Sequence, residues 1–445
     1  MDTIAAIATS SGIGSIAIVR VSGADALSVA LRLSRQTTLI PRHATLSFLY
    51  DSTCAPIDQA IVLYFKAPYS FTGEDVVEFQ CHGGSIVASM VLDALLDLGV
   101  RLAQPGEFSK RAFLNGRIDL SEAEAIAALI ETRSTDAAKI LTRQLKGELK
   151  GFVEHVRDQL VEMLAFIEVN IDYAEEDLPL DMMQKIRLRL DDLSEELRRT
   201  YESSERRKGL MSGFKIAIVG KPNVGKSSLL NALLSYDRAI ISDIAGTTRD
   251  TIEEELRVGS HLVRIVDTAG IRQSHDTIEQ IGIERSIAAI EESEIVIAMF
   301  DNSRTCDAED LHMLALLQTY EATKSVIYVL NKSDLPALFD RSLLHEGCLM
   351  LSAHRDTDLL IQSLQSLLDR CAHEDSIMLT SSRQVEAVKT AYKEVVASFD
   401  RLKEGQLELF AFHINTAVEA ISSITSAFER DEILDKMFSR FCLGK

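Results

Sequence analysis

Cysteine is sparse and scattered in this chain of 445 residues. The six cysteines stand at positions 54, 81, 306, 348, 371 and 442, and their spacing is not that of a metal-ligand set. A disulfide framework is improbable with such spacing, and the pattern suits a reducing compartment. We therefore expect free thiols and no structural zinc.

Basic residues are outnumbered by acidic residues. Lysine and arginine total 47, whereas aspartate and glutamate total 67, which gives a formal net charge of −20. A surface with this balance repels a phosphate backbone at long range. The composition therefore argues against a protein that coats nucleic acid broadly, although a local basic site is still allowed.

Long hydrophobic runs and targeting signals are also lacking. No apolar run approaches the ~20 residues of a membrane-spanning helix. Residues 1–15 contain no lysine or arginine and carry Asp2, unlike a secretory or mitochondrial presequence. We expect a cytoplasmic protein that makes no membrane contact.

The sequence does contain a phosphate-binding loop in the correct context. An apolar run at 216–219 predicts a buried strand, the glycine-rich segment GKPNVGKS (220–227) follows, and residues 228–233 predict a helix. In this order, successive backbone N–H groups at a helix N-terminus can surround phosphates. Lys226 is predicted to reach the β- and γ-phosphates and Ser227 to ligate Mg²⁺. A glycine-rich turn without a ligand is the less favoured interpretation.

Three later segments indicate that the nucleotide carries guanine. A predicted strand at 261–266 ends in DTAG (267–270), where Asp267 can hold Mg²⁺ through water and the Gly270 N–H can meet the γ-phosphate. A second predicted strand at 325–330 ends in NKSD (331–334). The Asp334 carboxylate can accept hydrogen bonds from guanine N1 and N2, a donor pair that adenine lacks. A third run ends at Ser352-Ala353, whose backbone could donate to guanine O6. Together these segments predict GTP as the ligand.

The chain is long enough for two or three domains. We interpret residues 1–118 as an α/β domain, 119–209 as helical, 210–375 as a P-loop G domain and 376–445 as a second helical segment. Neither helical segment has a partner within itself, so we expect the two to pack together with the G domain inserted between them.

Ser121 and Glu124 are expected to form a helix-capping box. The GxGxxA match at 12–17 precedes a predicted strand, so it is not a dinucleotide fingerprint. Adjacent strand residues Cys81 and His82 point to opposite faces, which disfavours a shared metal.

Five motifs resemble those of the tRNA-modification GTPase MnmE (TrmE) family over essentially the whole chain. They are FTGEDVVEF (71–79), PGEFSKRAFLNGRIDLSEAEA (105–125), GTTRD (246–250), DTAGIR (267–272) and the terminal CLGK (442–445). The resemblance implies a homodimer formed through N-terminal domains that bind a tetrahydrofolate derivative, either 5-formyl- or methylene-tetrahydrofolate. The matching folate contacts are Arg20, Glu78, Arg117 and Lys445, and the family commonly has lysine where Arg117 stands.

The resemblance also implies a reaction and a partner. Family members act with an FAD protein of the MnmG type, in a heterotetramer, to add an aminomethyl or carboxymethylaminomethyl group to C5 of the wobble uridine (position 34) of certain tRNAs. Cys442 is a candidate thiol for this chemistry, or else a residue that packs beside the folate site.

Hydrolysis of GTP needs groups that the common Ras-like pattern does not supply here. Ile271 stands where Ras-like proteins have the glutamine that orients water. The resemblance assigns that role to Glu279, assigns a K⁺ ion to Asn223, Ser242, Ile244 and Thr247, and assigns a Mg²⁺ contact to Thr248. Arg249 and Arg272 are further candidate catalytic groups. The predicted GTP contacts are Asn223, Val224, Gly225, Lys226, Ser227, Ser228, Ser242, Asp243, Ile244, Ala245, Gly246, Thr247, Thr248, Asp267, Thr268, Ala269, Gly270, Asn331, Lys332, Asp334, Ser352 and Ala353.

Two other functions compete with this one. The first is a non-enzymatic switch of the Era or Der type, which carries an RNA-binding module or tandem G domains. This chain has a single P-loop and no evident KH-like GxxG segment. The second is a folate-dependent methyltransferase with an idle G domain, which the full set of nucleotide motifs disfavours.

Overall fold

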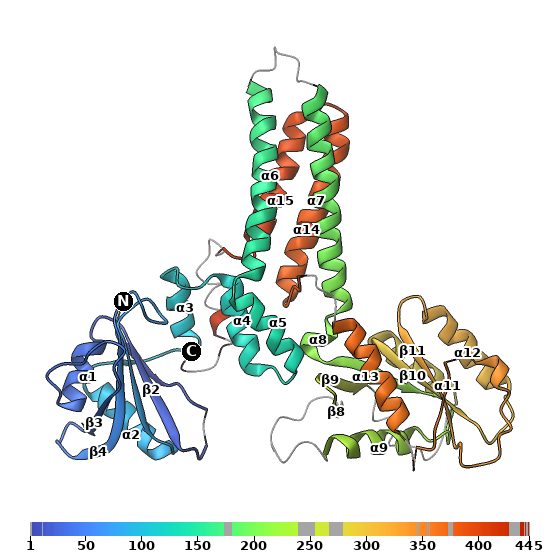
Figure 1. Ribbon diagram of the computed structural model, residues 1–445, viewed down its shortest axis with the longest axis horizontal. Helices are drawn as coiled ribbons and strands as arrows, with labels where there is room; N and C mark the ends of the chain where they lie inside the picture. Colours follow the sequence, from blue (N-terminus) through green and yellow to red (C-terminus); the bar gives the residue numbers. More distant parts are fainter. Residues whose placement is uncertain are drawn as a thin grey trace. The chain divides into compact units, whose positions relative to one another are not determined.

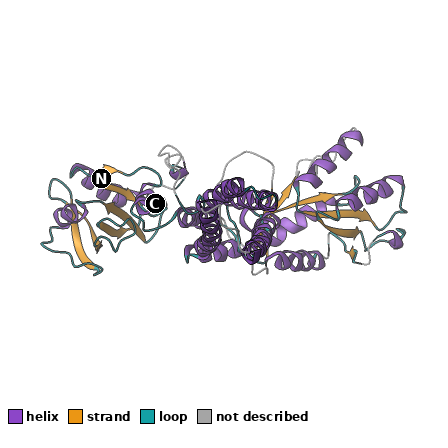
Figure 2. Cartoon of the chain, turned by 90° about the horizontal axis from the view of Figure 1, so that it is seen from above, coloured by secondary structure: helices purple, strands orange, loops and turns teal. Residues whose placement is uncertain are grey.

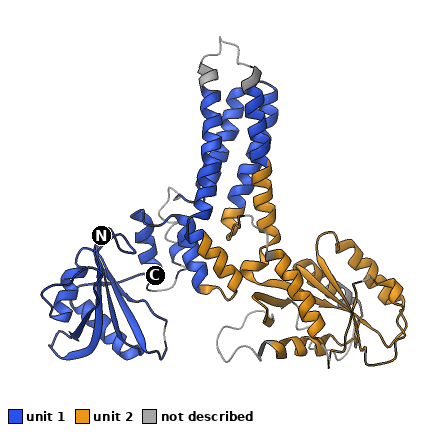
Figure 3. Ribbon diagram, in the orientation of Figure 1, with its two compact units in different colours: residues 1–130, 144–194, 386–445 blue, residues 131–143, 195–385 orange. Residues whose placement is uncertain are grey.

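The computed structural model describes residues 2–10, 12–172, 180–238, 254–266, 279–344, 347–353, 355, 357–372, 377–426, 437–439, 441 and 444. These residues fall into two compact units, coloured separately in Figure 3. Unit 1 comprises residues 1–130, 144–194 and 386–445, and unit 2 comprises 131–143 and 195–385. No helix among the described residues is both long enough and apolar enough to cross a membrane.

The N-terminal part of unit 1 is a six-stranded sheet in the order β3-β4-β5-β2-β1-β6. Neighbours are antiparallel except β1 and β6, which are parallel. Helices α1 (Ala26–Ser34) and α2 (Ser85–Asp97) pack on one face through alternate strand residues such as Val19 and Phe79. The strands are β1 (Ile4–Ile7), β2 (Ile16–Ser22), β3 (Thr45–Tyr50), β4 (Pro56–Phe65), β5 (Val76–His82) and β6 (Arg101–Leu102).

The opposite face of this sheet is apolar and open in its β3–β4 region. Leu46, Phe48 and Ile61 are exposed there, and Leu46 retains 63% of its accessible surface. Their places alternate with the residues that face α1 and α2, as strand geometry requires. On this same face, Arg20 of β2 lies opposite Glu78 of β5 in the strand register.

Unit 1 also contains a bundle of long helices. Figures 1 and 2 show α6 (Glu148–Asp172) and α15 (Leu407–Ser422) side by side with the unit 1 parts of α7 (Leu180–Arg206) and α14 (Ser382–Lys403). Residues 195–206 of α7 and 382–385 of α14 belong to unit 2. The buried residues of α6 recur at helical spacing, for example Val156, Leu160 and Ile167. The expectation that the two separated helical segments pack together is therefore confirmed for α6 and α15.

Two short helices connect the sheet and the bundle in the sequence, α3 (Glu107–Leu114) and α4 (Leu120–Glu131). The expected capping box at Ser121 and Glu124 is wrong. The Asp119 carboxylate accepts a hydrogen bond from the Glu122 N–H (2.9 Å), and the Glu122 carboxylate accepts one from the Asp119 N–H (2.8 Å). Because the helix begins at Leu120, the capping positions fall two residues earlier than the sequence pattern suggested.

Unit 2 is built on a six-stranded sheet in the order β12-β11-β10-β7-β9-β8, parallel except at β8. Helices α9 (Lys226–Arg238) and α13 (Asp358–Ala372) cover one face, and α11 (Glu279–Glu292) and α12 (Ala308–Tyr320) cover the other. The strands are β7 (Phe214–Val219), β8 (Glu254–Val258), β9 (His261–Val266), β10 (Ile295–Asp301), β11 (Ser325–Asn331) and β12 (Leu349–Met350). Unit 2 also contains α8 (Gly209–Ser212), the 3₁₀ turn η1 (Arg341–Leu343) and most of α5 (Thr135–Leu145).

Candidate guanine-nucleotide site

The predicted nucleotide motifs converge because of the sheet topology. Strands β7, β9, β10, β11 and β12 are parallel, so their carboxyl ends lie along one edge. The strand order changes direction at β7, which lies between β9 and β10. Ligands of open α/β sheets bind at such a switch point, outside the carboxyl ends of the strands. The P-loop follows β7 at this point.

Two glycines of the P-loop are required by neighbouring protein atoms. Gly220 has φ 149°, and a Cβ there would lie 2.5 Å from the Met299 carbonyl oxygen. Gly225 has φ 104°, and its Cβ would lie 2.2 Å from Nδ2 of Asn331. Glycine in a P-loop also lets the backbone approach phosphates closely, because a Cβ would block that approach. The structure adds a second reason, which is the closeness of β10 and of the guanine motif.

Lys226 is held by the loop it belongs to. Its Nζ donates hydrogen bonds to the carbonyl oxygens of Gly220 (2.6 Å) and Lys221 (2.8 Å). These acceptors carry no net charge, so burial of the ammonium lowers the pKa of Lys226 to about 8. An anion bound at this loop would relieve that cost. The site is therefore suited to a phosphate group.

Asn331 joins two of the predicted motifs. Its side chain is buried at 3% exposure, and its Nδ2 donates to the Val224 carbonyl oxygen of the P-loop (2.7 Å). Its Oδ1 accepts from the Ala353 N–H (2.9 Å). One amide thus fixes the P-loop against the segment after β12.

The other base-binding candidates lie at the same edge. Ser352 and Ala353 are buried, and Asp334 is exposed with no hydrogen-bond partner among the residues that the structure describes. The Ser333 N–H donates to the Leu351 carbonyl oxygen (3.2 Å), which joins the NKSD segment to the end of β12. Asn223, next to the P-loop glycines, is exposed and has φ 65°. Ser227 and Ser228 lie in the first turn of α9, and both are partly buried.

Several predicted contacts lie outside the described residues. Glu279 is the first residue of α11, and nothing further is described of its side chain. The candidates outside the described residues are Ser242, Asp243, Ile244, Ala245, Gly246, Thr247, Thr248, Arg249, Asp267, Thr268, Ala269, Gly270, Arg272, Cys442 and Lys445.

In the N-terminal domain, the structure brings together two of the predicted folate contacts. Arg20 Nε donates to Glu78 Oε1 (2.9 Å), and the guanidinium lies over the rings of Phe71 (5.6 Å) and Phe108 (5.7 Å). Arg20 also donates to the carbonyl oxygen of Gly444 (3.5 Å). Arg117 is exposed, and its Nε donates to the Ser70 carbonyl oxygen (3.2 Å).

The C-terminal segment approaches this domain closely at two glycines. A Cβ at Gly444 would lie 2.4 Å from the Ile7 carbonyl oxygen, and one at Gly106 would lie 2.2 Å from the Phe438 carbonyl oxygen. Both glycines have positive φ, 91° and 71°. Residues near the C-terminus therefore contact the N-terminal domain at two places, and Gly444 does so beside Arg20.

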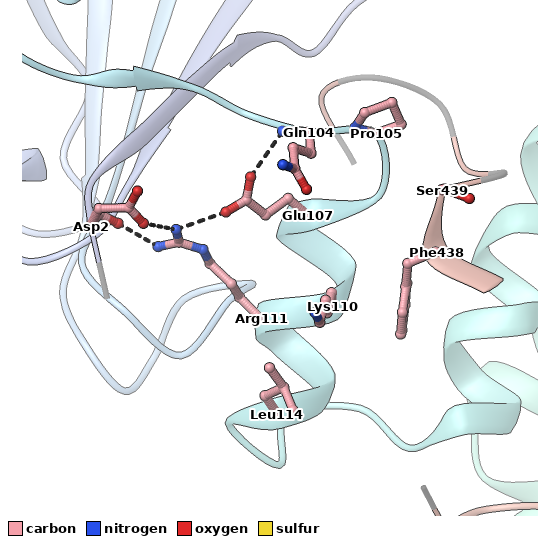
Figure 4. A pocket seen from close by; sticks show the side chains of 9 residues that line it. All are labelled: Asp2, Gln104, Pro105, Glu107, Lys110, Arg111, Leu114, Phe438 and Ser439. Atoms are coloured by element: carbon pink, nitrogen blue, oxygen red, sulfur yellow. Dashed lines mark hydrogen bonds and ion pairs between the residues drawn. The ribbon is translucent and has the colours of Figure 1, made fainter. Parts of the chain in front are cut away.

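A separate cavity of about 470 Å³ adjoins α3 (Figure 4). Its charged wall is internally paired, because buried Arg111 donates to Asp2 (2.8 Å) and Glu107 (2.9 Å). Arg20, Glu78 and Arg117 are not among its lining residues, which are Asp2, Gln104, Pro105, Glu107, Lys110, Arg111, Leu114, Phe438 and Ser439. The cavity is thus distinct from the predicted folate contacts.

Cys81 and His82 do not form a site. The Cys81 thiol is buried and donates to the Ala17 carbonyl oxygen (3.3 Å), and burial raises its pKa. His82 is exposed on the other face, with its Nδ1 2.7 Å from Asp58. The expected opposite orientation of these neighbours is confirmed.

Comparison with known proteins decides the family. Residues 3–117 match the family model described as "GTP-binding protein TrmE N-terminus", and residues 120–442 match that described as "MnmE helical domain". The "tRNA modification GTPase MnmE" of a Nitratiruptor species is 60% identical over 100% of this chain and 99% of its own. That of a Sulfurovum species is 56% identical with the same coverage. The chain belongs to the MnmE family of tRNA modification GTPases.

Membership of the MnmE family confirms three predictions. The family resemblance is correct, the fold comprises an N-terminal α/β domain, a helical domain and a P-loop GTPase domain, and the protein is an enzyme that hydrolyses GTP. A solved structure, Era in complex with MgGDPNP and a 16S ribosomal RNA fragment, shares 25% identity over 41% of this chain and 66% of that chain. Its TM-score is 0.25, so the assignment depends on the MnmE relatives.

Sequence reasoning missed the acidic residues that pair with lysines of this candidate nucleotide site. Asp301 at the end of β10 bonds Lys332, and Lys221 of the P-loop pairs with Asp307 and Asp310 of the α12 N-terminus. A buried strand pattern at 295–301 that ends in an acid was the available signal. It does not indicate which lysine the acid meets.

Proposed function

We propose that this protein is a K⁺-dependent GTPase that, with an MnmG-type FAD protein, modifies C5 of the wobble uridine of certain tRNAs. The one-carbon unit comes from a folate derivative, and the product is an aminomethyl or carboxymethylaminomethyl group. The division into residues 1–118, 119–209, 210–375 and 376–445 belongs to this proposal. So do the homodimer, the heterotetramer with the FAD protein and the cytoplasmic location.

The observation that carries the proposal is the meeting of three separate motifs at one sheet edge. Asn331 is bonded to Val224 of the P-loop and to Ala353 after β12, so phosphate-binding and base-binding segments are held together. Asp334 lies exposed within the same motif, available to accept from a guanine edge. The partly buried ammonium of Lys226 favours an anionic ligand.

Oxygen atoms of the P-loop side chains are suitable ligands for the two proposed metal ions. The Ser227 hydroxyl, at the start of α9, is the type of oxygen that completes Mg²⁺ coordination beside a phosphate. The Asn223 side-chain oxygen is a hard ligand, of the type that K⁺ prefers, and it lies on an exposed turn. Ser242, Ile244, Thr247 and Thr248 complete the proposed metal contacts. When bound, the cations neutralise charge that develops on the phosphate oxygens.

In the proposed hydrolysis, water attacks the γ-phosphorus and the bond to the β–γ bridging oxygen breaks. Glu279 orients the water, the role that the family resemblance assigns to it. Ile271, which stands where Ras-like proteins have a glutamine, has no hydrogen-bonding side chain for that task. Arg249 and Arg272 contribute positive charge near the phosphates. The chemistry itself is positioning and charge stabilisation, which is why the surrounding loops matter more than any nucleophilic side chain.

The open face of the N-terminal sheet supports the dimer and the folate site. Exposed apolar side chains such as Leu46, Phe48 and Ile61 gather there, and contiguous apolar surface of this kind marks interaction sites. The Arg20–Glu78 pair on that face offers donors and an acceptor for a polar ligand. We propose that Arg117 and Lys445 complete the folate contacts and that Cys442, if it reacts, does so beside them.

The GTPase part is tested by turnover in K⁺ and in Na⁺ at equal ionic strength. We expect faster hydrolysis in K⁺, and we expect Glu279→Ala to lower kcat by about 10²–10⁴. Glu292→Ala, an exposed position at the other end of α11, is the matched control and should not change the rate. Equal rates in both salts, or full activity of Glu279→Ala, would contradict the mechanism.

The tRNA part is tested by nucleoside analysis of tRNA from cells with and without the protein. Loss of the C5 modification at position 34 is expected, together with its restoration by the wild-type gene. If position 34 is unchanged and ribosome assembly is defective instead, the switch of the Era or Der type is the better function.

A further inference from the structure

The last residue of β10 contacts the NKSD segment (331–334), which is the proposed guanine motif. Asp301 lies opposite Asn331 in the β10–β11 register, and its side chain is 8% exposed. Its Oδ2 accepts a hydrogen bond from Nζ of Lys332 at 2.6 Å. Its Oδ1 accepts from the N–H (2.9 Å) and the hydroxyl (2.6 Å) of Ser303. Both carboxylate oxygens are therefore used, and Arg304 adds only a distant contact at 3.7 Å.

Lys332 has a backbone conformation that needs outside support. Its φ is 64°, in the left-handed region that L-residues other than glycine rarely adopt. Such conformations are unfavourable by themselves and persist where surrounding contacts hold them. The ion pair with Asp301 is such a contact. Two residues later the chain presents Asp334, so the turn at Lys332 sets where that carboxylate lies.

The neighbouring residue holds the remainder of the same loop. The Asn302 N–H donates to the Asn331 carbonyl oxygen (2.9 Å). The Asn302 carbonyl oxygen accepts from the N–H groups of Leu338 (2.9 Å) and Phe339 (3.3 Å). The loop that carries Asp334 is thus fastened at both ends, to Asp301 at the end of β10 and to Asn302, which follows it.

We propose that Asp301 is a positioning residue for guanine recognition, which holds Lys332 in its left-handed turn and thereby places Asp334 against the base. This inference rests on the proposed role of residues 331–334 in binding guanine. Under this proposal Asp301 itself touches neither base nor phosphate. Its effect is on nucleotide affinity and on discrimination between guanine and adenine, and not on the chemical step.

The ionisation of Asp301 agrees with this arrangement. Burial alone would raise the pKa of its carboxyl, but the hydrogen bonds from Lys332 and Ser303 outweigh burial and lower the pKa below its ordinary value. The carboxylate therefore stays charged through the neutral range and keeps its hold on the lysine.

The test is the affinity of the full-length protein for a fluorescent GDP analogue. Asp301→Asn keeps an acceptor for Ser303 but removes the charge that holds Lys332, so we expect about tenfold weaker binding, mainly through faster release. We also expect poorer rejection of ADP in competition, with kcat at saturating GTP within about twofold of the wild type. The matched control is Asp340→Asn. Asp340 accepts from the N–H and hydroxyl of Ser342 in the same way but has no lysine partner among the described residues.

A double-mutant cycle separates positioning from general loosening. If Asp301 acts through Lys332, Asp301→Asn combined with Lys332→Met should bind no more than about twofold more weakly than the weaker single variant. The proposal would be overturned if the losses of affinity in the two single variants multiplied in the double variant. It would also be overturned if Asp301→Asn bound the analogue as tightly as Asp340→Asn. If Asp301→Asn does not fold, Asp301→Glu decides, because it keeps the charge but lengthens the side chain that holds Lys332. Weaker GDP binding with poorer rejection of ADP supports the positioning role, and wild-type affinity overturns it.

One further variant distinguishes this inference from the function on which it rests. Asp334→Ala should abolish the preference for guanine over adenine. If it does not, residues 331–334 do not read the base and the proposed function fails as well. If it does while Asp301→Asn binds normally, only the positioning role is wrong.

Discussion

Removing the Asn331 amide should destabilise the G domain even in the absence of nucleotide. The side chain is buried and supplies two hydrogen bonds, to the Val224 carbonyl oxygen and from the Ala353 N–H. In Asn331→Ala both of those backbone groups stay buried and lose their partner. Each buried unsatisfied group costs about 1–3 kcal/mol, so the expected loss of unfolding free energy is about 2–6 kcal/mol.

Asn331→Asp tests the direction of the two hydrogen bonds. A carboxylate can still accept from the Ala353 N–H, but it sets a second acceptor against the Val224 carbonyl oxygen at 2.7 Å. A protonated carboxyl can donate to that oxygen. Burial and the facing Val224 carbonyl oxygen raise the folded-state pKa of the new acid above its unfolded value, so the neutral form is favoured. The variant should therefore be more stable at acid pH and lose stability as the pH rises through the folded-state pKa.

The assay is urea unfolding of the nucleotide-free full chain, repeated with GDP to identify the transition of the G domain by its shift. The matched control is Asn115→Ala. The Asn115 amide donates at the same distance, 2.7 Å, to the Thr72 carbonyl oxygen, but it is exposed and lies in unit 1. The reasoning is refuted if Asn331→Ala shifts the G-domain transition no more than Asn115→Ala. It also fails if Asn331→Asp is equally stable at both ends of the pH range.

Two further predictions concern the P-loop lysine and the C-terminal segment. The pKa of Lys226 is lowered to about 8, whereas bound phosphates favour the ammonium form. The affinity for GDP should therefore fall as the pH rises above 8, by up to about tenfold per pH unit. Binding should also take up protons, which calorimetry in two buffers would measure. Lys226→Arg should remove this pH dependence, and equal affinity of the wild type at pH 7 and 9.5 would contradict it. Gly106→Ala should displace residues 437–439, because its Cβ would lie 2.2 Å from the Phe438 carbonyl oxygen, and faster hydrogen exchange there would show it. Gly116→Ala has a similar φ of 67° but meets no atom within 4 Å, so it controls for backbone strain, and equal exchange in both variants would count against the contact.

Much of the nucleotide site could be predicted because its parts are contiguous in the chain. The strand, glycine loop and helix of 214–233 follow one another, and the NKSD segment directly follows a buried strand. Parallel strands with their ends at one edge then place these segments together by simple topology. The N-terminal α/β domain and the long helices were visible in the same way, from apolar spacing of two or of 3.6 residues.

Other features depended on contacts between residues far apart in the sequence. The partners of Asn331 lie 107 and 22 residues away, and Asp301 meets Lys332 across 31 residues. Gly444 approaches Ile7 across nearly the whole chain. Local patterns carry no information about such pairs, because a hydrogen bond between distant residues leaves no periodicity in either segment.

The sequence by itself thus determined the ligand class, since the proposed phosphate- and base-binding groups are short contiguous motifs at strand ends. Only the tertiary structure decided what holds those motifs in place. The glycine at 225 faces an asparagine side chain, and the acid that ends β10 reaches the lysine of the guanine motif. The physical reason is that binding groups are encoded locally, whereas the rigidity that makes them selective comes from packing between strands that only the folded sheet brings side by side.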